Sequence, residues 1–313
     1  MTGLRYAYLG PAGTFTEAAL RQIASPETAE FAPQVDVVAA IEAVRTGAAD
    51  HAVVAIENSV EGGVTAVLDT LAVGEPLVIL REMLVPVAFT LATRPGTALA
   101  DVRRIAAHPH AWAQCRRWLQ DNLPGVVHVP ASSNTAPAVL LAEEAGELGF
   151  EAALVPPTAV ATYGLTPLAD GVADNERAVT RFVLVGRPTD VPEPTGADKS
   201  SLVVHLPSNQ AGALLEMLEQ FSARGVNLSR IESRPIGDAL GRYSFSMDVE
   251  GHIAEERVAE ALMGLHRVCP HVRFLGSYPR ADQPHGGVRP GTFDADFVAA
   301  RAWVTSLREG RAH

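Results

Sequence analysis

Short apolar runs alternate with amphipathic stretches over residues 1–187, a pattern typical of an α/β domain with largely parallel strands. The apolar run from Leu77 to Arg94 is predicted to carry the chain out to a second lobe, at about residues 84–165, and residues Tyr163 to Thr180 bring it back. We therefore expect two lobes around a cleft, as in periplasmic binding proteins, with ligands beyond the carboxyl ends of the strands. The runs predicted to be strands are Arg5–Leu9, Ala52–Ile56, Leu77–Leu80, Val87–Thr93, Arg104–Ala107, Val126–Val129, Ala152–Val155 and Phe182–Val185.

A linker and a second, smaller domain are predicted after residue 187. Residues 188–200 are rich in proline and poor in apolar side chains, which indicates a linker. Residues 201–278 then follow the order βαββαβ, which predicts a ferredoxin-like sandwich of two helices on one sheet. The predicted elements are a strand over Ser201–Leu206, a helix over Ala211–Arg224, a hairpin of Val226–Ile236 with Arg242–Val249 around residues 237–241, a helix over Ala254–Val268 and a strand over Val272–Gly276.

The tail, residues 279–313, begins rich in proline and glycine and then shows helical periodicity from about Phe293. Asp294 and Asp296 near the start of this helix and Arg308 and Arg311 near its end complement the helix dipole. We favour docking of its apolar stripe on the same protein or on a second subunit over binding to a membrane surface.

Composition excludes several classes of protein. The net charge of -11, with no compensating basic block, argues against nucleic-acid binding. No apolar run reaches the roughly 18 residues of a membrane span, and the first residues read as a strand rather than a signal peptide, so we expect a cytoplasmic protein without a membrane partner. Cys115 and Cys269 are far apart and form no metal-binding motif, so we expect buried, reduced thiols and no metal.

The triplet Thr180-Arg181-Phe182 lies where a polar loop meets an apolar run. The guanidinium of arginine suits a carboxylate, and a threonine hydroxyl can donate to an oxygen that must leave. Together they suggest an anionic substrate that loses a hydroxyl. The alternative is that Thr180 begins a strand because of its strand propensity, with Arg181 in solvent.

Further polar residues follow predicted strands in the first domain. Each group also suits an ordinary cap or turn, yet several helix starts converging near Arg181 would supply positive potential for an anion in an acidic protein. The groups are Gly10 to Glu17, in which Thr14 and Glu17 form a capping-box pattern, Glu57-Asn58-Ser59 with Gly62-Gly63, His108 to Gln114, and Ser132-Ser133-Asn134-Thr135.

In this order and spacing, these segments resemble prephenate dehydratase over nearly the whole chain. The resemblance rests on Tyr8 to Thr16, Ile56 to Ser59, His108-Pro109 with Gln114-Cys115, and Thr180-Arg181-Phe182. The second domain resembles the ACT regulatory module of that family, through Gly212-Ala213-Leu214-Leu215 and Glu232-Ser233-Arg234-Pro235. The chain departs from the family at His110, where many members have glutamine, and at Ala107, where some have serine.

The resemblance implies a lyase without a cofactor that converts prephenate to phenylpyruvate in phenylalanine biosynthesis. We expect Thr180 to donate to the departing hydroxyl, Arg181 to hold a carboxylate and Asn58 to act beside them, while Glu57, if buried and protonated, is the rival donor. The expected substrate-binding residues are Thr14, Ser59, Gln114, Ser133 and Phe182, the last shaping the ring pocket.

For the second domain, the resemblance implies that phenylalanine regulates the enzyme by binding at an interface between two such modules, in a homodimer or homotetramer. Gly212 would let the backbone approach the ligand, or it would serve tight helix packing, and Glu232 to Pro235 could also be a plain strand end. The other expected contacts are Ala213, Leu214, Asn227, Leu228, Glu232, Ser233, Arg234 and Pro235.

Two other functions remain open at the level of sequence. Arogenate dehydratases share these motifs and accept an amino acid in place of the keto acid. A non-catalytic cytoplasmic sensor of an anion or amino acid would also place an anion-binding cleft between two lobes.

Overall fold

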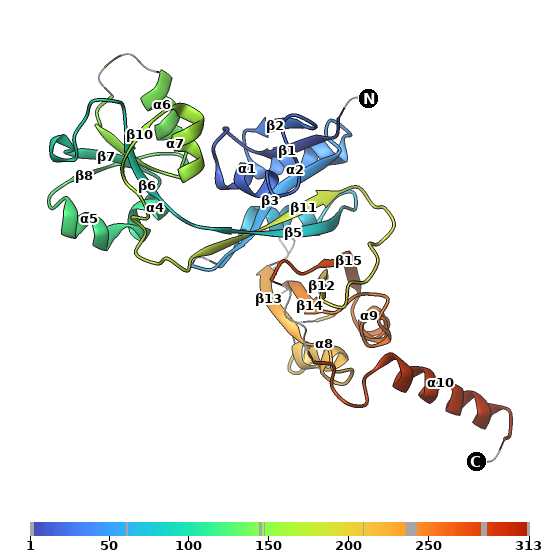
Figure 1. Cartoon of the computed structure of the whole chain (residues 1–313). Helices are drawn as coiled ribbons and strands as arrows, with labels where there is room; N and C mark the ends of the chain where they lie inside the picture. The colour runs from blue at the N-terminus through green and yellow to red at the C-terminus, as the bar shows by residue number, and fades with distance from the viewer. Residues whose placement is uncertain are drawn as a thin grey trace. The chain divides into compact units, whose positions relative to one another are not determined.

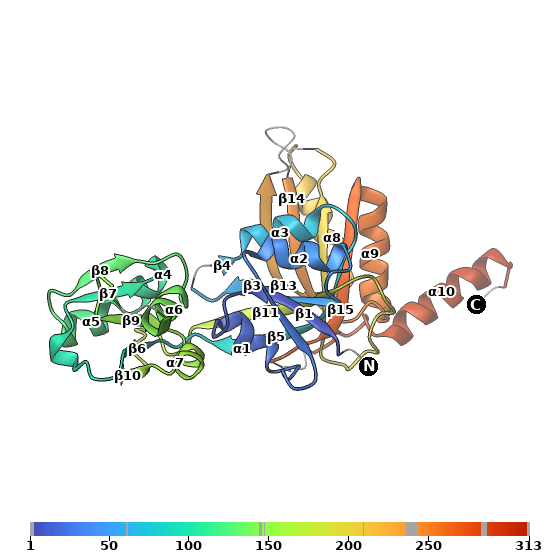
Figure 2. The same ribbon diagram turned by 90° about the horizontal axis from the view of Figure 1, so that it is seen from above.

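The computed structural model of the chain describes residues 3–60, 62–143, 146, 148–208, 210–235, 243–282 and 287–311. The chain forms two compact units, one of Met1–Val67 with Met83–Leu184 and the other of Leu68–Glu82 with Val185–His313. Figures 1 and 2 together label the helices and strands of both units. The mixed α/β class predicted from the sequence is confirmed.

The first lobe of unit 1 is built on a sheet of order β2-β1-β3-β11-β5, with the short β4 paired to β3. Strand β1 pairs in parallel with β2 and β3, as expected for an α/β domain. Tyr6, Tyr8, Leu20, Val53 and Phe182 form the centre of its core. The elements are β1 (Arg5–Leu9), α1 (Phe15–Leu20), β2 (Glu30–Gln34), α2 (Val37–Arg45), β3 (His51–Asn58), β4 (Gly62–Gly63), α3 (Thr65–Ala72), β5 (Val78–Pro86) and β11 (Val179–Gly186). Parts of α3, β5 and β11 are counted with unit 2, namely those within residues 68–82 and 185–186.

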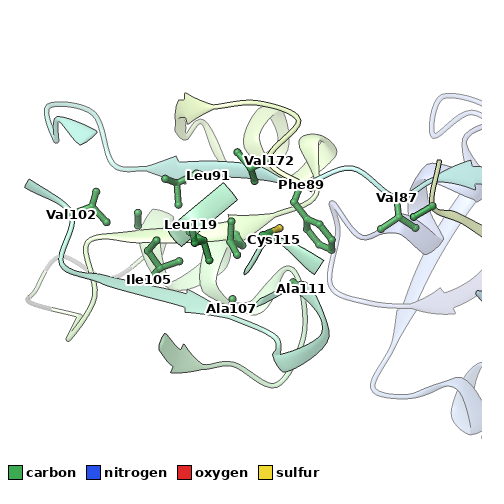
Figure 3. Close-up of a cluster of buried hydrophobic side chains, with 13 residues drawn as sticks. Val87, Phe89, Leu91, Val102, Ile105, Ala107, Ala111, Cys115, Leu119 and Val172 are labelled. Carbon is green, nitrogen blue, oxygen red and sulfur yellow. The ribbon is translucent and has the colours of Figure 1, made fainter. Parts of the chain in front are cut away.

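The second lobe has its own sheet, of order β10-β6-β9-β7-β8. Strand β7 is parallel to β8 and β9, whereas β6 is antiparallel to β9 and β10. Figure 3 shows its core, in which Cys115 lies among Phe89, Ile105 and Leu119. The elements are β6 (Thr90–Thr93), the 3-10 turn η1 (Leu99–Asp101), β7 (Arg104–Ala107), α4 (Pro109–Gln114), α5 (Arg116–Asn122), β8 (Val127–Pro130), α6 (Ala136–Glu143), β9 (Ala152–Val155), α7 (Pro157–Tyr163) and β10 (Thr166–Ala169).

The sequence missed three strands of these sheets, the two-residue β4 and the longer β2 and β10. Strands β2 and β10 both lie at a sheet edge, and both contain a proline, Pro33 and Pro167, which weakens the strand pattern and is tolerated only where one side of the strand is unpaired. The predicted strand Val87–Thr93 is wrong in its first half. Strand β5 ends at Pro86 and β6 begins at Thr90, so residues 87–89 pass from one sheet to the other.

Unit 2 confirms the predicted βαββαβ order, and its sheet runs β13-β14-β12-β15. Helices α8 and α9 pack on this sheet through Leu202, Met217, Phe221, Met247 and Leu265. The turn predicted at residues 237–241 lies outside the described residues. The elements are β12 (Asp198–His205), α8 (Ala213–Ser222), β13 (Leu228–Pro235), β14 (Tyr243–Glu250), α9 (Glu256–Val268), β15 (His271–Pro279) and α10 (Asp294–Arg308).

Residues 68–82 pack on the sheet of unit 2, although they come from the amino-terminal part of the sequence. The Lys199 ammonium lies 3.2 Å from both carboxylate oxygens of Glu82, and the Glu82 side chain is fully buried. A Cβ atom at Gly276 would lie 2.4 Å from the Ile79 carbonyl oxygen, so the two backbones approach closely. No sequence pattern indicated this association.

Further charged and polar groups are buried within the same sheet. The Asp248 carboxylate accepts hydrogen bonds from Arg230 Nε at 2.8 Å and from Ser201 Oγ at 2.6 Å, and Arg230 also donates to Ser246 Oγ at 2.9 Å. Each buried charge therefore has a partner of opposite sign or a hydrogen bond, as burial requires.

The described helices leave no candidate for a bilayer span, because none combines sufficient length with sufficient apolar character. The expectation that both cysteines are buried and unbridged is confirmed.

We expect Glu82→Gln to lower the free energy of unfolding by roughly 3–5 kcal/mol, because it leaves the Lys199 charge buried without its partner. Urea denaturation followed by circular dichroism measures the change. The double variant Glu82→Leu with Lys199→Met should recover most of the loss, since two apolar groups replace the pair.

The exposed pair Arg5–Glu30 provides the control, because Glu30→Gln removes the same charge at a cost of about 1 kcal/mol or less. Equal losses for Glu82→Gln and Glu30→Gln would contradict a stabilising role for the buried pair.

Candidate active site

The end of β3 meets the beginning of β11. The Ser59 amide donates to the Val179 carbonyl at 2.9 Å, and the Val179 amide donates to Ser59 Oγ at 2.9 Å. These two bonds join the polar turn after β3 to the first residues of β11. The structure thereby brings together two motifs that lie some 120 residues apart in the sequence.

Asn58 and Thr180 form the central hydrogen bond of this junction. The Asn58 amide Nδ2 donates to Thr180 Oγ1 at 2.8 Å, and Asn58 Oδ1 accepts from the Val60 amide at 2.8 Å. The second bond fixes which side of the amide group faces Thr180. Because Thr180 Oγ1 accepts from Asn58, its own hydrogen remains available to donate to another group.

Arg181 and Glu57 lie beside this pair. Arg181 is 5% exposed, and its Nη1 atom is 3.5 Å from Glu57 Oε2. The Glu57 side chain is 38% exposed. Glu57 is therefore only half-buried, whereas its role as a proton donor would require full burial. A buried guanidinium beside Thr180 provides local positive charge in an acidic protein.

Phe182 lies in the core of the first lobe rather than at its surface. It is 2% exposed and packs in the cluster that contains Tyr6, Tyr8 and Met83. Its packing anchors β11, the strand that carries Thr180 and Arg181.

Thr14 caps helix α1. Its Oγ1 atom accepts from the Glu17 amide at 3.2 Å and donates to the Leu9 carbonyl at 3.1 Å. The Glu17 carboxylate accepts from the Gly13 amide at 2.5 Å, one residue before the position expected for a capping box. A carboxylate of the chain itself therefore occupies the start of α1.

The same loop holds the two lobes of unit 1 together. Thr158 Oγ1 donates to the Gly13 carbonyl at 2.7 Å, and the Tyr163 hydroxyl donates to the Ala12 carbonyl at 2.9 Å. Gly13 has φ +85°, and a Cβ atom there would lie 2.9 Å from Ala159 Cα. Only glycine meets both requirements at this position.

The two tyrosines near this loop are held in their neutral form. Burial raises the pKa of Tyr8 to about 12, with a smaller contribution from the Glu17 carboxylate. Burial also raises the pKa of Tyr163. Both phenols therefore remain hydrogen-bond donors at physiological pH.

Gln114 and Ser133 lie in the second lobe. Gln114 ends α4 and is half-buried, and its backbone carbonyl accepts from the Asp174 amide at 2.7 Å. Ser133 Oγ accepts from the Ala136 amide at 3.0 Å at the start of α6, which is the capping role that its sequence position suggested. His108 caps α4 by accepting from the His110 amide at 3.3 Å.

Within the described ranges, no group of three or more histidine, cysteine, aspartate or glutamate side chains is placed to hold a metal ion.

Gly212 begins helix α8 of unit 2. It has φ +91°, a conformation that glycine adopts without strain, and a Cβ atom there would meet no atom within 4 Å. The glycine is therefore required by the backbone and not by helix packing. Ala213 is buried beside it, whereas Leu214 is 41% exposed.

Residues 227–235 carry the other predicted effector contacts. Asn227, Ser233 and Pro235 are exposed, whereas Leu228 and Glu232 are half-buried.

The Arg234 guanidinium makes two hydrogen bonds of 3.1 Å to the Asp69 carboxylate of α3, a partner that the sequence did not indicate. A cavity of about 310 Å³ lies beside this pair, with Leu68, Val203 and His205 in its lining.

Sequence comparison identifies relatives of both parts of the chain. The sequence model of the family described as prephenate dehydratase matches residues 6–190, and that of the ACT domain matches residues 200–267. The prephenate dehydratase of Amycolatopsis methanolica is 48% identical over 307 residues, which cover 98% of either chain.

Solved structures that resemble this one include the following two. A prephenate dehydratase from Arthrobacter aurescens, in complex with L-Phe, is 53% identical with a TM-score of 0.93, and the match covers 98% of this chain and 100% of that chain. GqqA, described as a novel type of quorum quenching acylase, is 31% identical with a TM-score of 0.78, over 88% of this chain and 98% of that chain.

Proposed function

The chain belongs to the prephenate dehydratase family, and on this basis we propose that it converts prephenate to phenylpyruvate, a carbon–oxygen lyase reaction of phenylalanine biosynthesis. The observation that carries the proposal is the hydrogen bond from Asn58 to Thr180, which leaves the threonine proton free to be donated beside a buried arginine. A sensor without catalysis would need no such oriented donor.

The reaction requires one proton and no oxidant. The bond between the ring and its carboxylate breaks, and its electron pair enters the ring while the bond to the ring hydroxyl breaks. The departing hydroxide takes a proton and leaves as water, so prephenate and one proton give phenylpyruvate, carbon dioxide and water. Because the ring becomes aromatic, the substrate supplies much of the driving force, and the protein has to orient it and assist the leaving group.

Thr180 assists the leaving group in this proposal. Asn58 holds the threonine oxygen as an acceptor, so the threonine O–H can point toward the departing hydroxyl. A threonine hydroxyl is a weak acid, and its part is to stabilise or relay the proton. Ser59 and Thr14 fix the loops around it, and Gln114 and Ser133 orient the substrate from the second lobe.

Arg181 holds a substrate carboxylate in this proposal. Its position beside Thr180 supports this role, and Glu57 fixes the guanidinium from one side. The partial exposure of Glu57 and its ion pair with Arg181 favour Thr180 over Glu57 as the donor.

The same hydrogen bond argues against an acyl-transfer function like that in the name of GqqA. A threonine that attacks an acyl group needs a neighbouring base to take its proton. The Asn58 amide donates to Thr180 and cannot take that proton, so the pair suits proton donation rather than nucleophilic attack.

We propose that L-phenylalanine regulates the enzyme at the start of α8 and along β13. The relative from Arthrobacter aurescens carries L-Phe, and the open space in front of Gly212 supports a ligand there. The proposed contacts are Gly212, Ala213, Leu214, Asn227, Leu228, Glu232, Ser233, Arg234 and Pro235. For Arg234, the ion pair with Asp69 favours an indirect role, because that pair occupies the guanidinium.

We also propose a role for each part of the chain. Residues 1–187 carry catalysis, residues 201–278 form the regulatory domain and residues 279–313 form the tail. The linker predicted at residues 188–200 ends before Asp198, because residues 198–200 belong to strand β12. We further propose that the protein works in the cytoplasm as a homodimer or homotetramer.

Purified protein is expected to release phenylpyruvate from prephenate, with the rate lowered by phenylalanine. The assay should be run beside arogenate, because a faster release of phenylalanine from arogenate would identify an arogenate dehydratase instead. Turnover of neither substrate would refute the enzyme assignment. Calorimetry with phenylalanine tests the regulatory part separately.

Thr180→Ala is expected to lower kcat by roughly 100 to 10,000-fold, the usual contribution of a positioned proton donor, with a much smaller change in KM. Thr180→Ser keeps the hydroxyl and should retain most of the activity. Steady-state kinetics at saturating prephenate provide the measurement, and near-normal kcat in Thr180→Ala would remove Thr180 from the role.

Asn58 is expected to act through Thr180. Asn58→Ala should therefore lower kcat in the wild-type background and have little further effect in the Thr180→Ala background. Additive losses in this double-mutant cycle would mean that Asn58 contacts the substrate independently.

Arg181→Lys keeps the charge and loses the planar fork, so kcat/KM is expected to fall roughly tenfold or more. Thermal unfolding of the same variant separates this effect from loss of the fold. Glu57→Gln serves as the comparison, because it leaves the guanidinium in place. An unchanged kcat/KM in Arg181→Lys would exclude a two-point contact with a carboxylate.

A further inference from the structure

Helix α10 buries none of its residues against its own chain. Phe293, at its N-cap, is 51% exposed, and Trp303 and Leu307 are 56% and 50% exposed. In Figures 1 and 2 the helix extends away from α8 and α9. A helix of this length is marginally stable in water unless its apolar face packs against something. The exposed apolar side chains of α10 therefore require another surface to pack against.

The contacts that attach α10 to α9 lie on a different side of the helix. Arg301 forms ion pairs with Glu256 and Glu260, and Asp294 Oδ1 accepts from the Glu256 amide at 2.9 Å. Successive residues are turned by about 100°, so Ala300 points about a quarter-turn away from Arg301. Helix α9 thus fixes the orientation of α10 and leaves Phe293, Trp303 and Leu307 exposed, whereas Phe297 is half-buried.

The apolar stripe consists of Phe293, Phe297, Ala300, Trp303, Val304 and Leu307, and four of its large side chains are placed symmetrically about Ala300. Phe297 and Trp303 lie three residues before and after it, and Phe293 and Leu307 lie seven residues before and after it. Large apolar side chains therefore flank a small one at the spacing of a two-helix seam. The four large side chains of one helix therefore come opposite those of a second copy when the two helices are antiparallel.

The charged residues of α10 also favour an antiparallel pair of helices. Asp296 lies in its first turn and Arg308 in its last, whereas Asp294 of the first turn is on the side that contacts α9. In an antiparallel pair, the acidic start of one helix lies beside the basic end of the other, whereas a parallel pair would place like charges together.

We propose that α10 packs antiparallel against α10 of a second copy of this chain, with Ala300 on the twofold axis. The contact is isologous, since the same residues serve on both sides. The small side chain of Ala300 lets the two helices approach closely at the crossing point. The interface is independent of the catalytic proposal, because it uses no residue of unit 1.

The first test is the molar mass of the full-length protein by sedimentation equilibrium. The double variant Trp303→Glu with Leu307→Glu is expected to have half the mass of the wild-type assembly at equal concentration. Val298→Glu with Ala302→Glu adds the same charge to exposed positions off the stripe and should keep the wild-type mass. Circular dichroism confirms that both variants remain folded.

A cross-link tests the position of the axis. In Ala300→Cys, the two introduced thiols are expected to lie close enough for a disulfide, so mild oxidation should give a covalent dimer. Ala302→Cys points away from the seam and should remain uncoupled. The native cysteines are both buried and do not compete.

Several outcomes would overturn the proposal. A wild-type chain that is monomeric, or a stripe variant that keeps the wild-type mass, would mean that the stripe docks on its own chain or on another partner. Equal cross-linking of the Ala300→Cys and Ala302→Cys variants, or none at position 300, would exclude the antiparallel pair.

Discussion

The joining of β3 to β11 is the constraint on which the candidate site depends. Ser59 and Val179 exchange two hydrogen bonds, and this places Asn58 within hydrogen-bond distance of Thr180. Neither residue alone specifies chemistry, because an asparagine in a turn and a threonine in a strand are both ordinary. Their contact makes one oxygen an acceptor and frees one proton, and the packing of Phe182 in the core keeps β11 in the register that maintains it.

Charges in this acidic protein are compensated locally rather than globally. Arg181 is buried beside Glu57, Glu17 occupies the start of α1, and Lys199 is buried against Glu82. The start of α1 had appeared from sequence to be one of several positions that could attract an anion, but the Gly13 amide there already binds the Glu17 carboxylate. The positive potential for an anionic substrate therefore rests more on Arg181 than on the helix ends.

The sequence predicted some parts of the fold better than others, for identifiable reasons. The βαββαβ order of unit 2 was predicted because its amphipathic periods are regular and its helices bury one clear face, as Met217 and Phe221 do. Strands β2 and β10 were missed because prolines and exposed edges weaken the apolar signal. The association of residues 68–82 with unit 2 could not be predicted, because no feature of the sequence indicates that Glu82 pairs with Lys199.

The sequence by itself determined which residues were available for chemistry and, through the order of its motifs, the family to which they belong. Local patterning is sufficient for this, because turns, caps and strand ends are encoded by neighbouring residues. Only the tertiary structure decided which of them meet. It paired Asn58 with Thr180, placed Phe182 in the core, left Glu57 partly exposed and turned Arg234 toward Asp69. Such contacts depend on how distant segments pack together, and that packing is a property of the whole chain rather than of any one stretch of it.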